Sequence, residues 1–130
     1  MASVVPLLAV ADVQVAVEFY ENRLGFTREF VYPEAGPVFA TIRLDGARLM
    51  LEAAGAFAAK YGETAAGQPR GRGVDLNLTV DGDIDAHYLK VTAAGTLPVR
   101  PIFTTDYGMR QFTVRDQDGY LLTFIRHVGE

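Results

Sequence analysis

The sequence predicts an α+β fold made of two tandem βαβββ modules, each a sheet with a helix on one face. The main observation is a repeat: a strand, a helix and three strands are predicted in the first half, and the same order restarts at Gly73. The chain has 130 residues, 49% of them hydrophobic, which suits a single domain with a buried core. We expect the modules over about residues 3–53 and 73–128, with a linker over about residues 54–72.

The first module begins with an apolar segment, residues 3–11, that predicts a strand. Asp12 is a favoured helix N-cap, and apolar residues then recur at helical spacing until Gly25, which is typical of a helix end. Further strands are predicted over residues 26–32, 38–44 and 47–53. Asp45-Gly46 separates the last two and favours a type I′ hairpin turn.

The second module repeats this order. Residues 74–81 alternate as a strand, and a helix starts at Asp83 or Asp85, runs through Ala94 and ends at Gly95. Further strands are predicted over residues 97–103, 109–115 and 120–127. Prolines place the first of these at a sheet edge, and Gln117-Asp118-Gly119 predicts a three-residue hairpin with a left-handed glycine. In the linker, a helical turn is expected near residues 56–61.

Alternation along the strands separates a core face of each sheet from a second, more polar face. The predicted core set is Val38, Ala40, Ile42, Leu44, Ala47, Leu49 and Leu51, and in the second module Val74, Leu76, Leu78, Val80, Phe112, Val114, Leu122 and Phe124. The opposite face carries Phe39, Thr41, Arg43, Arg48, Met50 and Glu52, and in the second module Asp75, Asn77, Thr79, Gln111, Thr113, Leu121, Thr123 and Ile125. We expect the two polar faces to line a ligand cleft.

Composition excludes several classes of function. The formal net charge is −4, and no cluster of Lys and Arg marks a surface for nucleic acid. Without cysteine, neither a disulfide framework nor thiolate chemistry is available. No apolar stretch approaches the roughly 20 residues of a membrane span, and the N-terminus lacks a signal-peptide pattern. We therefore expect a cytoplasmic protein with no nucleic-acid partner and no membrane partner.

Three segments carry motifs at fixed spacing: VADVQVAVEFYENRLGF (residues 10–26), LDGARLMLEA (44–53) and YGMRQFTVRDQDGYLLTF (107–124). The most specific parts are D-x(6)-FY-x(3)-LGF and the D-x-DG of the final hairpin. In this order, on a repeated βαβββ pattern, they resemble the glyoxalase, bleomycin resistance protein and extradiol dioxygenase superfamily, the vicinal oxygen chelate fold. The resemblance covers nearly the whole chain and implies two βαβββ modules, a homodimer and a ligand cleft formed by curled sheets.

Enzymes of this superfamily commonly hold a divalent metal with four side chains, two from each module. By position, the resemblance places these side chains at Val5, Met50, Asp75 and Thr123. Only Asp75 is a good ligand, because such metals prefer imidazole or carboxylate donors. Glu52 lies one pleat from Met50 and could add a second oxygen. We expect no metal and no cofactor.

No catalytic residue is predicted. Ser3 is the only serine and lies near the N-terminus, so a Ser-His-Asp triad is not available. His87 is interpreted as a solvated surface residue of the second helix, and His127 as a residue that follows the last strand near a frayed terminus. Asp75 and Glu52 are interpreted as carboxylates that give the cleft a negative potential rather than as an acid–base pair. The balance therefore favours a protein that is not an enzyme.

A binding cleft is the favoured hypothesis, because its residues combine apolar surface, neutral hydrogen-bonding groups and two anions. The candidate ligand-binding residues are Phe39, Thr41, Met50, Glu52, Asp75, Asn77, Tyr107, Gln111, Thr113, Leu121 and Thr123. They suit a planar, polar, cationic organic molecule. The resemblance points to the bleomycin-resistance-like branch, whose small proteins neutralise a drug by sequestering it, without a metal.

Two alternatives stay open. One is a metal-dependent lyase, isomerase or dioxygenase that uses a weak metal site at Asp75 and Glu52. The other is an interaction subunit that keeps the fold as a scaffold and binds no small molecule. The first predicts stoichiometric metal, and the second predicts a cleft filled by the protein's own side chains.

Overall fold

The computed structural model describes residues 2–62 and 70–129, which form two βαβββ modules. The first contains β1 (Leu7–Val10), α1 (Val13–Leu24), β2 (Thr27–Tyr32), β3 (Phe39–Leu44) and β4 (Ala47–Ala53). The second contains β5 (Asp75–Thr79), α3 (Ile84–Ala93), β6 (Arg100–Thr104), β7 (Met109–Arg115) and β8 (Leu121–His127). The predicted α+β fold class is confirmed.

The segment between the modules contains a helix, α2 (Ala54–Tyr61), where the sequence predicted only a helical turn near residues 56–61. Residues 63–69 of the predicted linker lie outside the described residues. No helix in the described part of the chain is long and apolar enough to cross a membrane.

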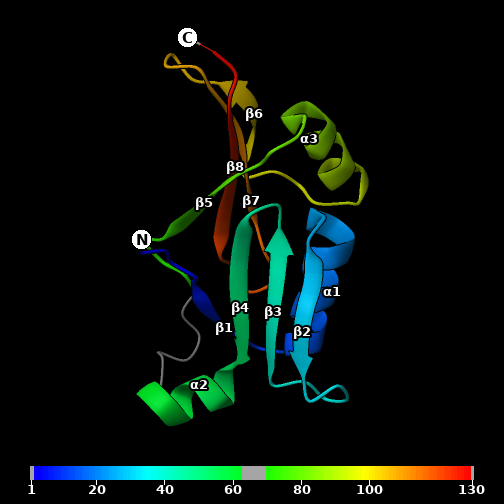
Figure 1. The fold of residues 1–130 in the computed structure, drawn as a ribbon, viewed down its shortest axis with the longest axis vertical. Coiled ribbons are helices and arrows are strands. Elements are labelled where there is room, and N and C mark those ends of the chain that lie inside the picture. Colours follow the sequence, from blue (N-terminus) through cyan, green and yellow to red (C-terminus); the bar gives the residue numbers. More distant parts are fainter. Residues whose placement is uncertain (1, 63–69, 130) are drawn as a thin grey trace.

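Each module forms its own four-stranded mixed sheet, with strand orders β1-β4-β3-β2 and β5-β8-β7-β6. In each sheet the first strand runs parallel to the last, and the other neighbours are antiparallel. Figure 1 shows the two sheets one above the other, with α1 and α3 on the same side and α2 beyond the end of the first sheet. The helices therefore cover one face of the sheets, and the polar face of the second sheet points away from the helices.

Local signals place the first module's helix and turn. The Asp12 side chain accepts a hydrogen bond from the backbone N–H of Val15, and Gly25 ends α1 with a left-handed φ of 86°, as predicted. The expected type I′ turn is wrong, because Asp45 has a positive φ of 52° but Gly46 does not. Asp45 accepts a hydrogen bond from the backbone N–H of Asp81 in the second module, at 2.8 Å, so this turn contacts the other module.

The second module follows the sequence closely. Asp83, rather than Asp85, caps α3 by accepting hydrogen bonds from two backbone N–H groups of its first turn. Strand β6 lies at the sheet edge, as its prolines predicted, and its pairing with β7 is irregular between Arg100 and Phe103. Gly119 in the β7–β8 turn has a φ of 97°, which confirms the predicted left-handed position.

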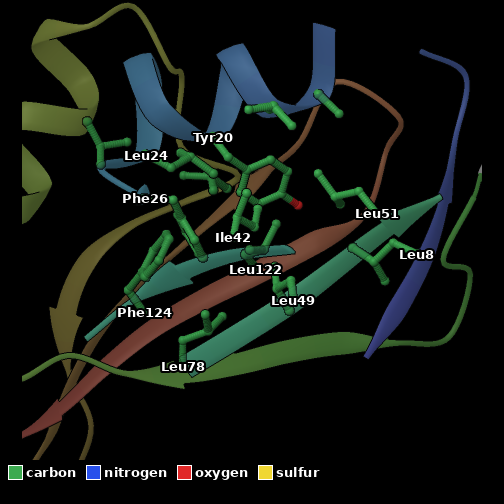
Figure 2. Packing of buried hydrophobic residues seen from close by; sticks show 14 of the residues in the cluster. Leu8, Tyr20, Leu24, Phe26, Ile42, Leu49, Leu51, Leu78, Leu122 and Phe124 are labelled. Atoms are coloured by element: carbon green, nitrogen blue, oxygen red, sulfur yellow. The ribbon is translucent and has the colours of Figure 1, made fainter. Parts of the chain in front are cut away.

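One hydrophobic core serves both modules. Tyr20 and Leu24 of α1 pack with residues of β3, β4, β5 and β8, among them Ile42 and Leu122 (Figure 2). Two predicted core residues are exposed: Val38 at 43% and Val74 at 49%. Both precede the first residue of a strand, so the alternation that buries their neighbours has not yet begun there.

Polar contacts around the β7–β8 turn tie the second module to the first; we call them the inter-module latch. The latch residues are Ala9, Ala11, Tyr20, Asp116, Asp118 and Tyr120. The Tyr20 hydroxyl donates to Asp116 Oδ2 at 2.6 Å, and the backbone N–H of Asp118 and of Tyr120 donate to Asp116 Oδ1 at 2.9 Å. The backbone N–H of Ala11 donates to Asp118 Oδ1, and the Tyr120 hydroxyl donates to the carbonyl of Ala9. The latch therefore satisfies buried polar groups from both modules.

Candidate functional site

The polar face of the second sheet holds a chain of three hydrogen-bonded side chains. The Thr123 hydroxyl lies 2.8 and 2.9 Å from the two carboxylate oxygens of Asp75, and 2.7 Å from the Thr113 hydroxyl. Because a carboxylate only accepts, Thr123 donates to Asp75, and Thr113 donates to Thr123. Both threonines are buried, at 5% and 1% exposure, whereas Asp75 is exposed. The Asp75 carboxylate is therefore oriented by Thr123 on the sheet side and remains accessible to a ligand on the solvent side.

Strand register places the other predicted residues of the second module on the same face. Leu121 is the β8 partner of Asp75, and Asn77 is the β5 partner of Thr123. Gln111 lies two residues before Thr113 on β7. The structure thus brings together six of the predicted site residues around one carboxylate, namely Asp75, Asn77, Gln111, Thr113, Leu121 and Thr123.

Two residues of this face were missed by the sequence analysis. Arg100 is the β6 partner of Thr113, and Phe103 is the β6 partner of Gln111, so both point to the polar face. The Arg100 guanidinium lies over the Phe103 ring, 4.5 Å from its centroid, which is a cation–π contact. The irregular pairing between them shifts which β6 side chains face each side of the sheet. Strict alternation of side chains along the strand therefore could not place both residues on the polar face. The signal in the sequence was an arginine three positions before a phenylalanine in a predicted edge strand.

The first module's candidates lie on the outer face of the first sheet. Phe39 of β3 pairs with Glu52 of β4, and Thr41 of β3 pairs with Met50 of β4. Phe39 also lies 6.2 Å, between ring centroids, from Phe30, which is a further exposed aromatic residue of this face. Glu52 is not free for a ligand, because it forms an ion pair with Lys60 of α2 at 2.8 Å.

The two groups of candidates remain apart. Among the described residues, no hydrogen bond, ion pair or ring contact joins the first-sheet candidates to those around Asp75. Between the modules lies an open groove of about 310 Å³, lined by the segment around Val5, the start of β4 and part of β5, and of the candidates it includes only Asn77. Tyr107 lies in the turn between β6 and β7, 70% exposed and beyond the sheet face. The single chain therefore presents two open faces.

The residues present do not fit a divalent metal. At the four positions that the resemblance selects, Val5 has no donor atom, Met50 offers a thioether, and Thr123 already gives its proton to Asp75. The described residues contain no group of three or more His, Cys, Asp or Glu side chains placed to hold an ion. Glu52, considered as a further oxygen donor, is held by Lys60. A single carboxylate is too small a donor set for a zinc-like or iron-like site.

The other ionisable groups of note lie away from the polar faces. Burial raises the pKa of Tyr20 well above its usual range, and burial also raises the pKa of Asp116, opposed by its hydrogen bonds from Tyr20 and two backbone N–H groups. His87 is not the solvated residue that the sequence suggested: it is partly buried, with Nε2 2.9 Å from the Leu24 carbonyl and its ring edge-on to Phe124. These groups join the modules rather than face a ligand.

Comparison with known proteins identifies a family and several similar structures. The family model described as the Glyoxalase/Bleomycin resistance protein/Dioxygenase superfamily matches residues 2–124. TioX from Micromonospora sp. ML1 is 26% identical, with a TM-score of 0.77 over 99% of this chain and 98% of that one. A glyoxalase/bleomycin resistance protein/dioxygenase from Nocardioides is 21% identical, with a TM-score of 0.74 over 98% of this chain and 85% of that one, which shows the fold alone. No curated protein matches the chain.

Proposed function

The chain belongs to the glyoxalase/bleomycin resistance protein/dioxygenase superfamily, and within it we propose that the protein binds and sequesters a small organic molecule without a metal. The proposed ligand is planar and polar and carries a cationic or hydrogen-bond-donating group, as many antibiotics do. The protein would act in the cytoplasm and leave its ligand chemically unchanged.

The observation that carries this proposal is the Asp75–Thr123–Thr113 chain. Two buried hydroxyl groups hydrogen-bond toward one exposed carboxylate and orient it. Burying these hydroxyls has a desolvation cost that an ordinary surface carboxylate does not require. A carboxylate fixed in this way is preorganised to accept from a ligand cation or N–H group, which lowers the ordering cost of binding. Leu121 and Asn77 beside it would supply an apolar contact and a neutral amide.

We propose further that the protein works as a homodimer in which a second copy covers the open faces. The outer face of the first sheet exposes Phe30 and Tyr32, at 53% and 62%, with their rings parallel and 6.4 Å apart between centroids. Exposed aromatic surface of this kind is typical of interfaces and ligand clefts. Phe39, Thr41 and Met50 on that face would then contribute to the same cleft as Asp75. Light scattering on purified protein should give twice the mass of one chain, and the mass of a single chain would contradict the dimer.

Calorimetric titration with two probes in the presence of EDTA tests the binding function. Proflavine is a planar aromatic cation at neutral pH, and acridine is its largely uncharged counterpart. We expect proflavine to bind more tightly than acridine and Asp75→Asn to weaken proflavine binding about fivefold, as expected for one partly exposed ion pair. Glu34→Gln removes the same charge from an exposed loop of the first module and should leave binding unchanged.

The same experiment separates the alternatives. If divalent metal stabilised the protein and EDTA abolished all binding, the metal-dependent lyase, isomerase or dioxygenase would replace the sequestration proposal. If neither probe bound and metals had no effect, the proposal would fail in favour of a scaffold subunit.

A further inference from the structure

We propose that the polar face of the second sheet binds an elongated amphoteric molecule, with a cationic or donor group at Asp75 and a carboxylate at Arg100. This inference rests on the proposed binding function and names the chemistry of its ligand. Its observation is a row of side chains that crosses the whole sheet: Asp75 on β5, Thr123 on β8, Thr113 on β7 and Arg100 on β6.

The row has one unpaired charge of each sign. Asp75 accepts from Thr123 and, within the described residues, has no Lys or Arg partner. Arg100 is exposed, and its guanidinium lies over the Phe103 ring without a carboxylate partner in the described part of the chain. Other arginines of this structure do pair: Arg28, Arg48 and Arg110 each contact a carboxylate. A guanidinium that lies over an aromatic ring can still offer its N–H groups to a planar, bidentate acceptor such as a carboxylate.

The spacing of the charges sets the shape of the ligand. Asp75 and Arg100 lie on the two edge strands, and Asp75 leans one strand inward to reach Thr123. Two to three interstrand spacings correspond to about 10 to 14 Å between the charges. Between the charges lie the buried Thr113 and Thr123, with the half-buried Leu121 and Gln111 beside them, so the middle of the ligand would contact uncharged side chains. A compact amino acid would be too short to reach both ends.

Arg115 offers a matched comparison on the same face. It is the β7 partner of Leu121, and its guanidinium donates to the Gly119 carbonyl in the β7–β8 turn, at 3.2 Å. It carries the same charge as Arg100 and is also exposed, but its guanidinium donates to the turn and lies over no aromatic ring of the described residues. Arg115→Gln therefore controls for a general loss of positive charge.

Three biphenyl probes test the inference. The first carries an aminomethyl group at one para end and a carboxylate at the other, and in the other two a methyl group replaces either the carboxylate or the aminomethyl group. By calorimetric titration in EDTA, we expect wild-type protein to bind the amphoteric probe at least about fivefold more tightly than either analogue. In Arg100→Gln, the amphoteric probe should bind no more tightly than the amine-only analogue. In Asp75→Asn, it should bind no more tightly than the acid-only analogue. Arg115→Gln should change neither difference in affinity.

The outcomes distinguish this inference from the function on which it rests. If the amphoteric and amine-only probes bound equally well to wild type and both depended on Asp75, the acid end at Arg100 would be refuted while the binding function stood. If Arg115→Gln removed the advantage as fully as Arg100→Gln, the specific role of Arg100 would also be refuted. If no probe bound, both proposals would fail.

Discussion

Removing the Tyr20 hydroxyl tests how strongly the inter-module latch stabilises the fold. In Tyr20→Phe the buried ring remains and keeps its edge-on contact with Phe26, whose centroid is 5.0 Å away. What is lost is a 2.6 Å hydrogen bond to the buried carboxyl of Asp116. Hydrogen bonds to charged groups contribute about 1.5 to 3 kcal/mol, and Asp116 Oδ2, left without its partner in the variant, adds a desolvation cost. We expect the free energy of unfolding to fall by about 2 to 3 kcal/mol.

Urea unfolding followed by circular dichroism measures this change, with Tyr120→Phe as the matched control. Tyr120 donates to the neutral carbonyl of Ala9 at the same interface, at 2.8 Å, so its loss should cost only about 1 kcal/mol. If the two variants cost the same, or if Tyr20→Phe cost less than about 0.5 kcal/mol, the buried bond to Asp116 would not be a main stabilising contact of the latch.

The cost of Tyr20→Phe should depend on pH in two opposite ways. Burial raises the pKa of Asp116, so the stability linked to that carboxyl is fully present below the ordinary carboxyl pKa and is lost as the pH rises through the raised value. Because Tyr20 opposes this rise, its removal raises the pKa further, and the cost of the substitution grows over that window. Burial also raises the pKa of Tyr20 itself. Above about pH 10 the free energy of unfolding of the wild type therefore falls by up to about 1.4 kcal/mol per pH unit, whereas that of Tyr20→Phe does not fall for this reason. The difference in stability between the two proteins should therefore become smaller at high pH.

Further substitutions probe other parts of the account, each by urea unfolding. Thr123→Val removes the donor to Asp75 and the acceptor of Thr113, so we expect a loss of about 1 to 2 kcal/mol together with weaker proflavine binding; retained binding would contradict the positioning role. Asp12→Ala removes the N-cap of α1 and should cost about 1 kcal/mol, whereas no change would mean that the cap is replaced by water. Gly71→Ala places a Cβ 2.5 Å from Cδ1 of Tyr120 at a φ of +71°, so a loss of about 1 to 3 kcal/mol is expected, and a neutral result would show that Tyr120 moves freely.

The fold could be predicted from the sequence because its signals are local. Asp12 and Gly25 mark the ends of α1 through their own backbone and side-chain chemistry, and Gly119 marks the β7–β8 turn. Alternation within the strands separated the apolar core face from the polar face, and among the predicted core residues it failed at Val38 and Val74, each of which precedes the first residue of a strand.

What the sequence could not reveal depends on contacts distant along the chain. Tyr20 and Asp116 are 96 residues apart, and neither residue signals the other. His87 contacts the end of α1 across the module boundary, which helix periodicity within α3 does not show. Arg100 joins the candidate site through an irregularity in the β6–β7 pairing, and no pattern of period two predicts that.

The most direct test of the central claim is a nuclear magnetic resonance titration that records the backbone amides of Asp75, Thr113 and Thr123. Proflavine added in EDTA should shift these signals, and Mn²⁺ added to the ligand-free protein should not selectively broaden them. Selective broadening around Asp75 and Met50 at micromolar Mn²⁺, or proflavine shifts confined to other residues, would contradict a metal-free binding face on the second sheet.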